Sequence, residues 1–291
     1  MTTASSSPSI SVRLGRAVER RALPVFTTAA IAYLLIPIAV MFIFSFNRVD
    51  QTLGDGKFNY QWHAFSFEAW LHPLDWPGLG DSLYASLWIA AMSTIFSTIL
   101  GTLIGLALTR YSFRGRGAIN SLIFLPMATP ELVMGSSLGI LFVATALPPL
   151  RGSPVPTLFP FGITTILIAH IMFNISYVVV TVKARLAGFD RRLEEAAMDL
   201  GANEWLTFWK VTFPLIFPGI MAAALLAFSL SIDDFIITSF VSGTQNTFPI
   251  WVYGIIRNAL PPQINVIGSI IFLVAVLAVA SSTLRTGRPV R

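Results

Sequence analysis

Three carboxylates lie inside stretches of the sequence that are otherwise apolar. Glu131 lies in the run 118–146, and Asp233 and Asp234 are adjacent in the run 215–240. Neither run contains a lysine or an arginine. A carboxylate at membrane depth costs roughly 2.5 to 3.5 kcal/mol, so it normally faces a cavity or a partner. The three residues therefore indicate a path that attracts cations.

The same carboxylates can also serve the structure alone. Asp233 and Asp234 can cap a helix end at the outer interface or pair with Arg257, and Glu131 can bond a neighbouring helix. Neighbouring residues of a helix point about 100° apart, so only one of the two aspartates is expected to face a cavity squarely. Of the three acids, we expect Glu131 and Asp234 to matter most.

A lone histidine, His170, lies in the apolar run 161–182. Without further ligands nearby, a hydrogen-bonded packing role is favoured over metal ligation or proton relay. Asn174 and Tyr177 follow at four and seven residues and share its helical face, which fits a polar cavity wall or helix packing. Because aromatic walls suit a cation, Tyr177 joins the three acids as a candidate substrate-path residue.

Catalytic chemistry has little support in this sequence. The absence of cysteine excludes disulfides, thiolate metal sites and thiol nucleophiles. The only Gly-Lys pair, Gly56-Lys57, lacks the rest of a phosphate-binding loop. No nucleophile–base pair or metal-ligand spacing is present. We expect no catalytic residue, no metal and no bound cofactor in this chain.

A second pattern lies in the segment 190–214. Asp190 can cap a short helix, Gly201 suits the left-handed residue just past its end, and Asn203 can cap a second helix that stops at Pro214. The pattern predicts a compact helix-turn-helix.

The two expected helices differ in character. Glu194 and Glu195 fall in the first turns of the first helix, where the helix dipole favours anions. The second helix carries an apolar stripe that needs a surface to bury against, either in this protein or in a partner's groove. The stripe comprises Trp205, Leu206, Phe208, Trp209 and Thr212.

The composition identifies the environment that must hold these residues. Of the 291 residues, 55% are hydrophobic and only 11% are charged, and the mean hydropathy is +0.73. Globular proteins carry about 25% charged residues. The chain is therefore predicted to be an all-α, polytopic membrane protein.

Six apolar runs are long enough to cross a bilayer as helices. They cover about 23–46, 82–109, 118–146, 161–182, 215–240 and 263–284. Fifteen of the 19 lysines and arginines then fall on one side together with both termini, which predicts a cytoplasmic location for that side. The net charge of +5 thus reflects topology, and no nucleic-acid partner is expected.

Three regions follow along the chain. Residues 1–22 are expected to form a disordered, basic cytoplasmic tail, and 285–291 a second cytoplasmic tail. Residues 23–284 form the six-span domain, with the segment 190–214 on the cytoplasmic side. The first run ends without a cleavage pattern and is interpreted as an uncleaved span.

The segment 190–214 resembles the EAA loop of the permease subunits of ABC importers. Glu195-Ala196-Ala197, Gly201, Val211, Phe213 and Pro214 match that motif at its spacing, with Val and Phe in place of the commoner Ile and Leu. The resemblance implies a type I permease fold. It also implies that Glu195, Ala196, Ala197, Gly201 and Pro214 belong to a coupling helix that docks into an ATPase subunit.

The same resemblance implies a set of partners. They are an ATPase dimer, which binds ATP and magnesium, a second homologous permease, an extracytoplasmic substrate-binding protein and the bilayer of a prokaryotic plasma membrane. The alternative surface for the second helix is the inner leaflet of the membrane.

Further segments resemble type I importer permeases, and the last three of them are more narrowly similar to permeases of the spermidine/putrescine type. They are 45–47, 65–70, 81–83, 129–135, 230–243 and 261–265. A polyamine combines several ammonium groups with an apolar stem, which suits separated carboxylates between aromatic walls. The expected function is translocation of a polyamine. Related permeases for iron, thiamine or anions share the scaffold, and an ion-coupled secondary transporter is the alternative from another class.

Overall fold

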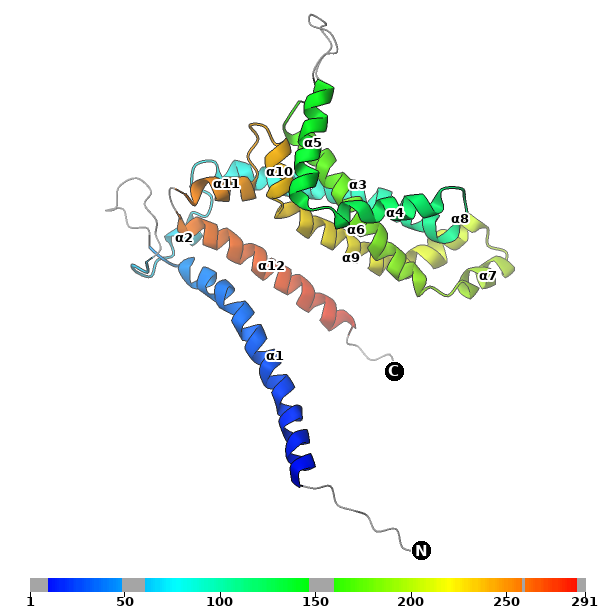
Figure 1. Cartoon of the computed structure of the whole chain (residues 1–291), viewed down its shortest axis with the longest axis horizontal. Coiled ribbons are helices and arrows are strands. Elements are labelled where there is room, and N and C mark those ends of the chain that lie inside the picture. Colours follow the sequence, from blue (N-terminus) through cyan, green and yellow to red (C-terminus); the bar gives the residue numbers. More distant parts are fainter. Residues whose placement is uncertain (1–9, 49–60, 147–159, 258–259, 287–291) are drawn as a thin grey trace, which may run out of the picture. The chain divides into compact units, whose positions relative to one another are not determined.

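The computed structural model describes residues 10–48, 61–146, 160–257 and 260–286, and these are almost entirely helical (Figure 1). Within these ranges the only strand-like pairing is an isolated bridge between Asn47 and Phe65. The predicted all-α architecture is confirmed. Predictions for the tail residues 1–9 and 287–291, and for the loop 147–159, lie outside the described residues.

The chain divides into two compact units. The first combines residues 1–76 with 256–291 and contains α1 (Ile10–Phe44), α2 (Glu68–Leu71) and α12 (Pro262–Thr286). Its loop packs aromatic rings on one another: the ring of Phe46 stacks on those of Phe65 and Trp70. Trp70 also donates a hydrogen bond of 3.0 Å to the Ser45 hydroxyl.

The second unit, residues 77–255, holds both candidate sites. Its helices are α3 (Leu79–Arg110), α4 (Arg116–Ala128), α5 (Glu131–Ala146), α6 (Ile163–Ala187), α7 (Arg192–Asp199), α8 (Glu204–Thr207), α9 (Phe213–Ile232), α10 (Ile236–Val241) and α11 (Phe248–Ile255). Helices α3, α6 and α9 pack on one another and form its centre. Helices α7 and α8 lie at one end of the unit, and α10 and α11 at the other (Figure 1).

Close packing of α3 on α6 depends on two glycines. A Cβ atom on Gly101 would lie 2.6 Å from Val178, and one on Gly105 would lie 3.3 Å from Val182. The two glycines are four residues apart in α3, and the two valines that they meet are four residues apart in α6, in the same order. The two helices therefore run parallel. Small residues allow this approach of helix backbones inside a membrane.

Four helical stretches are long and apolar enough to cross a membrane: 22–44, 79–110, 163–187 and 204–232. Helices α4 and α5 together form a fifth candidate, and residues 262–277 of α12 form a shorter apolar helix. The chain is thus a multi-pass membrane protein. A total of six spans stays a prediction.

The third predicted span, 118–146, is broken at Pro130, as expected for a proline inside a helix. Helices α4 and α5 meet at a bend of 107°. Pro130 has no N–H group to donate, and it keeps Thr129 extended, with φ −81° and ψ 131°. The helix therefore stops at Ala128 and restarts at Glu131 in a new direction.

The predicted fifth span also departs from one continuous helix. Helix α9 ends at Ile232 and α10 begins at Ile236, so Asp233 and Asp234 lie in a break. Aspartate side chains compete with helical hydrogen bonding by bonding nearby backbone N–H groups. At its other end the span begins earlier than expected, at Glu204 rather than residue 215.

The first helix begins before the predicted tail ends. Helix α1 starts at Ile10, so residues 10–22, expected to be disordered, are helical. Arginine, alanine, leucine and glutamate, which have high helix propensity, make up eight of the 13 residues of this segment.

The packing of α3 on α6 generates a first test. Gly101→Ala should lower the stability of the purified protein by about 1 to 3 kcal/mol because the methyl group collides with Val178. Gly105→Ala should cost less. Gly80→Ala, in the same helix with nothing within 4 Å, is the matched control and should be neutral. Equal melting temperatures of the Gly101 and Gly80 variants in detergent would contradict this packing.

Candidate functional site

The segment 190–214 forms the predicted helix-turn-helix. Helix α7 ends at Asp199, and Gly201 has φ +87°, in the left-handed region. The N–H groups of Gly201 and Ala202 donate to the carbonyls of Met198 and Ala197, at 2.9 and 3.1 Å, which closes the helix end. Asn203 caps α8 by accepting a 2.8 Å hydrogen bond from the Leu206 N–H.

Two details of this segment differ from the prediction. The carboxylate of Asp190 accepts from the Arg192 N–H at 3.0 Å, yet α7 begins at Arg192, so Asp190 lies one residue before the capping position. The second helix does not stop at Pro214. A π-helical turn, Phe208–Thr212, joins α8 to α9, and Phe213 donates to the carbonyl five residues back. This wider turn shifts the hydrogen-bond register just before Pro214, which lacks an N–H.

The helix-turn-helix exposes several large apolar side chains. Leu200 and Trp205 are 89% and 71% exposed, and Leu193, Met198 and Leu206 are also exposed. Glu195 and Ala196 lie on the accessible side of α7, and Ala197 is half-buried. Such a concentration of exposed large apolar side chains marks an interaction surface.

The carboxylate of Glu194 fixes this segment to the membrane helices. The sequence alone predicted only its favourable interaction with the helix dipole. Glu194 is buried and bonds Arg110, the last residue of α3, and the hydroxyl of Thr212 in the π-helical turn. The guanidinium group of Arg110 also lies 5.4 Å from the centre of the Phe189 ring. The Arg191 guanidinium donates to the Thr109 carbonyl at 3.2 Å.

The pKa of Glu194 reflects opposing effects. Burial raises the pKa, but hydrogen bonds from Arg110 and Thr212 and the positive charges of Arg110 and Arg191 outweigh it. The pKa of Glu194 therefore lies below its ordinary value of 4.5. No local pattern reveals this role, because Arg110 lies 84 residues earlier in the chain.

The second group of candidate residues lies at the helix breaks. Glu131 is the first residue of α5 and is exposed, and no other described residue forms a hydrogen bond with its carboxylate. It acts electrostatically on Tyr177, a half-buried residue of α6. The Tyr177 ring packs edge to face on Phe173, with 4.9 Å between ring centres.

The two aspartates have different environments. Asp233 follows the last residue of α9 and is exposed. The side chain of Asp234 is 7% exposed and accepts hydrogen bonds from the N–H of Thr238 at 2.8 Å and from its hydroxyl at 2.6 Å. Its second oxygen lies 3.4 Å from the Ile237 N–H. Asp234 thus accepts hydrogen bonds from the first turn of α10, although it lies one residue before the capping position, Phe235.

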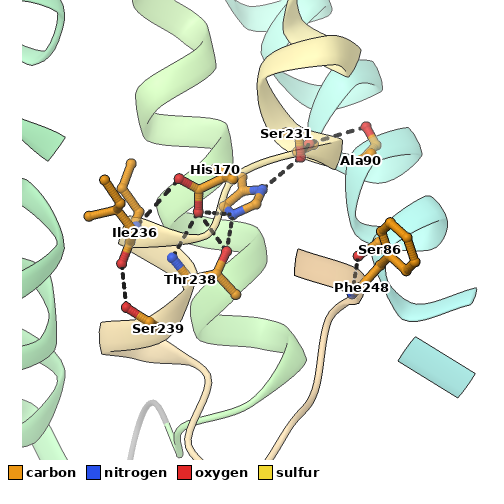
Figure 2. A network of polar contacts seen from close by, with 11 residues as sticks. Ser86, Ala90, His170, Ser231, Ile236, Thr238, Ser239 and Phe248 are labelled. Carbon is orange, nitrogen blue, oxygen red and sulfur yellow. Dashed lines mark hydrogen bonds and ion pairs between the residues drawn. The ribbon is translucent and has the colours of Figure 1, made fainter. Parts of the chain in front are cut away.

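His170 has the hydrogen-bonded packing role that its sequence context favoured. Figure 2 shows its ring between Ser231, at the end of α9, and Thr238, in α10. His170, Asp234, Ser231 and Thr238 form one polar network with Ser93 of α3, whose hydroxyl lies 2.9 Å from that of Ser231. Sequence reasoning identified His170 but could not identify its partners.

Packing of α5 on α10 relates Glu131 to the aspartates. A Cβ on Gly135 would lie 3.1 Å from the Ile237 Cα, and one on Gly139 would lie 3.0 Å from the Phe240 carbonyl oxygen. The contact partner moves from Ile237 to Phe240 in α10 as one goes from Gly135 to Gly139 in α5, so the two helices run parallel. Glu131, at the start of α5, and the segment 233–235, just before α10, therefore occupy corresponding positions at the ends of two packed helices.

The Glu194 contacts generate a second test. Glu194→Gln should lower stability at pH 7 by about 1.5 to 3 kcal/mol because hydrogen bonds to a charged group are lost. A depressed pKa contributes stability that is complete above pH 4.5 and is lost as the pH falls through the folded-state value. The melting temperature of the unchanged protein should therefore fall more on acidification than that of the variant. Glu204→Gln, at an exposed position, is the control and should keep the original pH dependence.

Solved structures with similar folds are transporters. The chain aligns with the crystal structure of a bacterial ABC transporter involved in the import of the acidic polysaccharide alginate, with a TM-score of 0.59 and 19% identity over 98% of this chain and 100% of that one. An alginate ABC transporter in complex with a pentasaccharide-bound periplasmic protein gives a TM-score of 0.63 and 16% identity over 95% and 99% of the two chains. At such identities the likeness shows the fold alone.

Relatives found by sequence have a higher identity to this chain than these structures do. The spermidine/putrescine transport system permease protein PotC of Escherichia coli strain K12 is 34% identical over 89% of this chain and 91% of its own. The putrescine transport system permease protein PotI of the same organism is 36% identical over 82% and 81% of the two chains.

A family model for the binding-protein-dependent transport system inner membrane component matches residues 97–286. That region contains the helix-turn-helix, the bend before Glu131 and the break at Asp233. With the permease fold and the EAA segment in place, the chain belongs to this family and is an inner-membrane permease subunit of an ABC importer.

Proposed function

We propose that this permease translocates a polyamine such as spermidine or putrescine, and that Glu131 and Asp233 line the path. The observation that carries the proposal is the pair of exposed carboxylates at two helix breaks within apolar segments. The relatives that transport spermidine and putrescine support the same substrate class.

The arrangement of the two breaks suits a cation with several charges. Glu131 begins α5 and Asp233 lies just before α10, and these parallel helices pack through Gly135 and Gly139. A polyamine can place ammonium groups against separate carboxylates and its methylene stem against the ring of the half-buried Tyr177. Attraction to fixed carboxylates lowers the cost of moving a cation through a low-dielectric layer.

The assigned role of Asp234 differs from that of its neighbour. Hydrogen bonds from Thr238 and the contact with His170 engage its carboxylate. We therefore assign Asp233, rather than Asp234, to the exposed path in this conformation. This assignment revises the expected ranking, in which Glu131 and Asp234 matter most.

The energy source is proposed to lie outside this chain. An ATPase dimer binds ATP and magnesium, and its groove receives the apolar face of α7 and α8, including Leu200 and Trp205. A second homologous permease completes the path, and an extracytoplasmic binding protein delivers the substrate. The distribution of positive charge supports a cytoplasmic location of both termini in a prokaryotic cell.

The coupling role can be tested at Gly201. Gly201→Val should reduce copurification of the ATPase and transport at least about tenfold, because a β-branched residue resists the left-handed backbone conformation of this position. Gly201→Asn is the matched control, since asparagine tolerates this conformation. Nothing lies within 4 Å of the missing Cβ, so crowding does not affect the comparison. Normal transport by a stably inserted Val variant would exclude docking through this turn.

Substrate charge is tested in the reconstituted complex with its binding protein. Spermidine or putrescine should stimulate ATP hydrolysis and be taken up, whereas iron, thiamine or anions should not. Glu131→Gln and Asp233→Asn should each reduce uptake about tenfold per assembled complex, since they remove charge while keeping size. Stimulation by another solute would reject the polyamine proposal, and uptake driven by an ion gradient without the ATPase would favour a secondary transporter.

A further inference from the structure

We propose that His170 is a positioning residue for transport: it holds Asp234 and the break between α9 and α10 so that the carboxylate of Asp233 stays exposed. The proposal rests on the function proposed above. His170 itself would not touch the substrate, because it is 3% exposed. Its effect on transport would pass through Asp234 and the backbone of the break.

A single imidazole ring bridges the two sides of this break. Its Nδ1 lies 2.6 Å from the hydroxyl of Ser231, in the last turn of α9. Its Nε2 lies 2.9 Å from the hydroxyl of Thr238 in α10 and 3.3 Å from the Asp234 carboxylate. Figure 2 shows these contacts converging on the ring from both helices. Residues 233–235 are therefore held from both ends by one side chain of α6.

The hydrogen-bond roles follow from the acidic partner. An ionised carboxylate only accepts, so Nε2 carries a proton toward Asp234. In the neutral ring, Nδ1 then accepts a hydrogen bond from the Ser231 hydroxyl. The Ser93 hydroxyl in turn lies within hydrogen-bond distance of Ser231 and of the Ala90 carbonyl oxygen. The network thus fastens the break to α3 and α6, the helices that pack most closely in this unit.

This network gives the adjacent residues Asp233 and Asp234 different roles. Asp234 faces donors from Thr238, Ile237 and His170 and is buried. Asp233 is the adjacent residue and remains exposed. Without the ring, the Asp234 carboxylate would lose a charge-assisted partner while still buried, which is costly and favours a rearranged turn. The direction of Asp233 depends on that turn.

The test is a double-mutant cycle in the reconstituted complex, supplied with saturating spermidine-loaded binding protein. The variants are His170→Leu, Asp233→Asn and the double change, with uptake measured per assembled complex. His170→Leu should reduce uptake about tenfold because a hydrogen bond to a charged group is lost. The same change should have little further effect once Asp233 is neutral. An equal loss in both backgrounds, or normal uptake by His170→Leu, would overturn the proposal.

A conservative variant covers the case in which His170→Leu does not assemble. His170→Gln keeps a donor near the position of Nε2 and should retain more uptake than His170→Asn, whose shorter side chain does not reach Asp234. Equal uptake by the two amide variants would count against the proposal. His72→Gln is the control, because it removes an exposed His–Asp pair of 3.2 Å with Asp75 and should leave uptake unchanged.

A second measurement does not depend on the substrate. The sequence has no cysteine, so Asp233→Cys introduces a unique thiol whose alkylation rate reports its exposure. The rate should change several-fold when His170→Leu is added, and an unchanged rate would reject the positioning role. If the unchanged complex takes up no polyamine, the proposed function fails, while this measurement still decides the role of His170.

Discussion

A helix that is interrupted inside a membrane must find new partners for its freed backbone groups, because lipid supplies none. This constraint shapes both breaks in the larger unit. Where α4 ends, the N–H and hydroxyl groups of Thr129 both bond the Leu125 carbonyl. Where α10 begins, Asp234 accepts from the first N–H groups. Each break therefore requires polar side chains at a depth where an apolar helix needs none, and exposed acids accompany both.

The end of this unit that carries α7 and α8 meets a related requirement through charge. The buried Glu194 joins the end of α3, the start of α7 and the π-helical turn by bonding Arg110 and Thr212. A buried carboxylate is tolerated only when it is paired, so this residue fixes three elements at once. The exposed apolar side chains of α7 and α8 consequently belong to elements that are fixed to the membrane helices, and not to a free loop.

Much of this architecture could be predicted from local sequence signals. The apolar runs gave the main helices, and Gly201 and Asn203 gave the turn, because conformational preference at such positions depends on one residue. Other features depend on partners distant in the chain. The direction taken after Pro130 depends on packing of α5 against α10, and the roles of His170 and Glu194 depend on Ser231, Thr238 and Arg110. The spacing of residues along one sequence does not predict these contacts.

The π-helical turn before Pro214 makes α8 and α9 one continuous helix, residues 204–232. At 1.5 Å per residue this rod is about 43 Å long, and it connects the exposed Trp205 to the residue that precedes Asp233. A rigid rod acts as a lever: pivoting it by about 10° at one end sweeps the other end through about 7 Å, more than one helical turn. A small rotation of this helix about its Trp205 end would thus produce a displacement of several ångströms at the end next to Asp233.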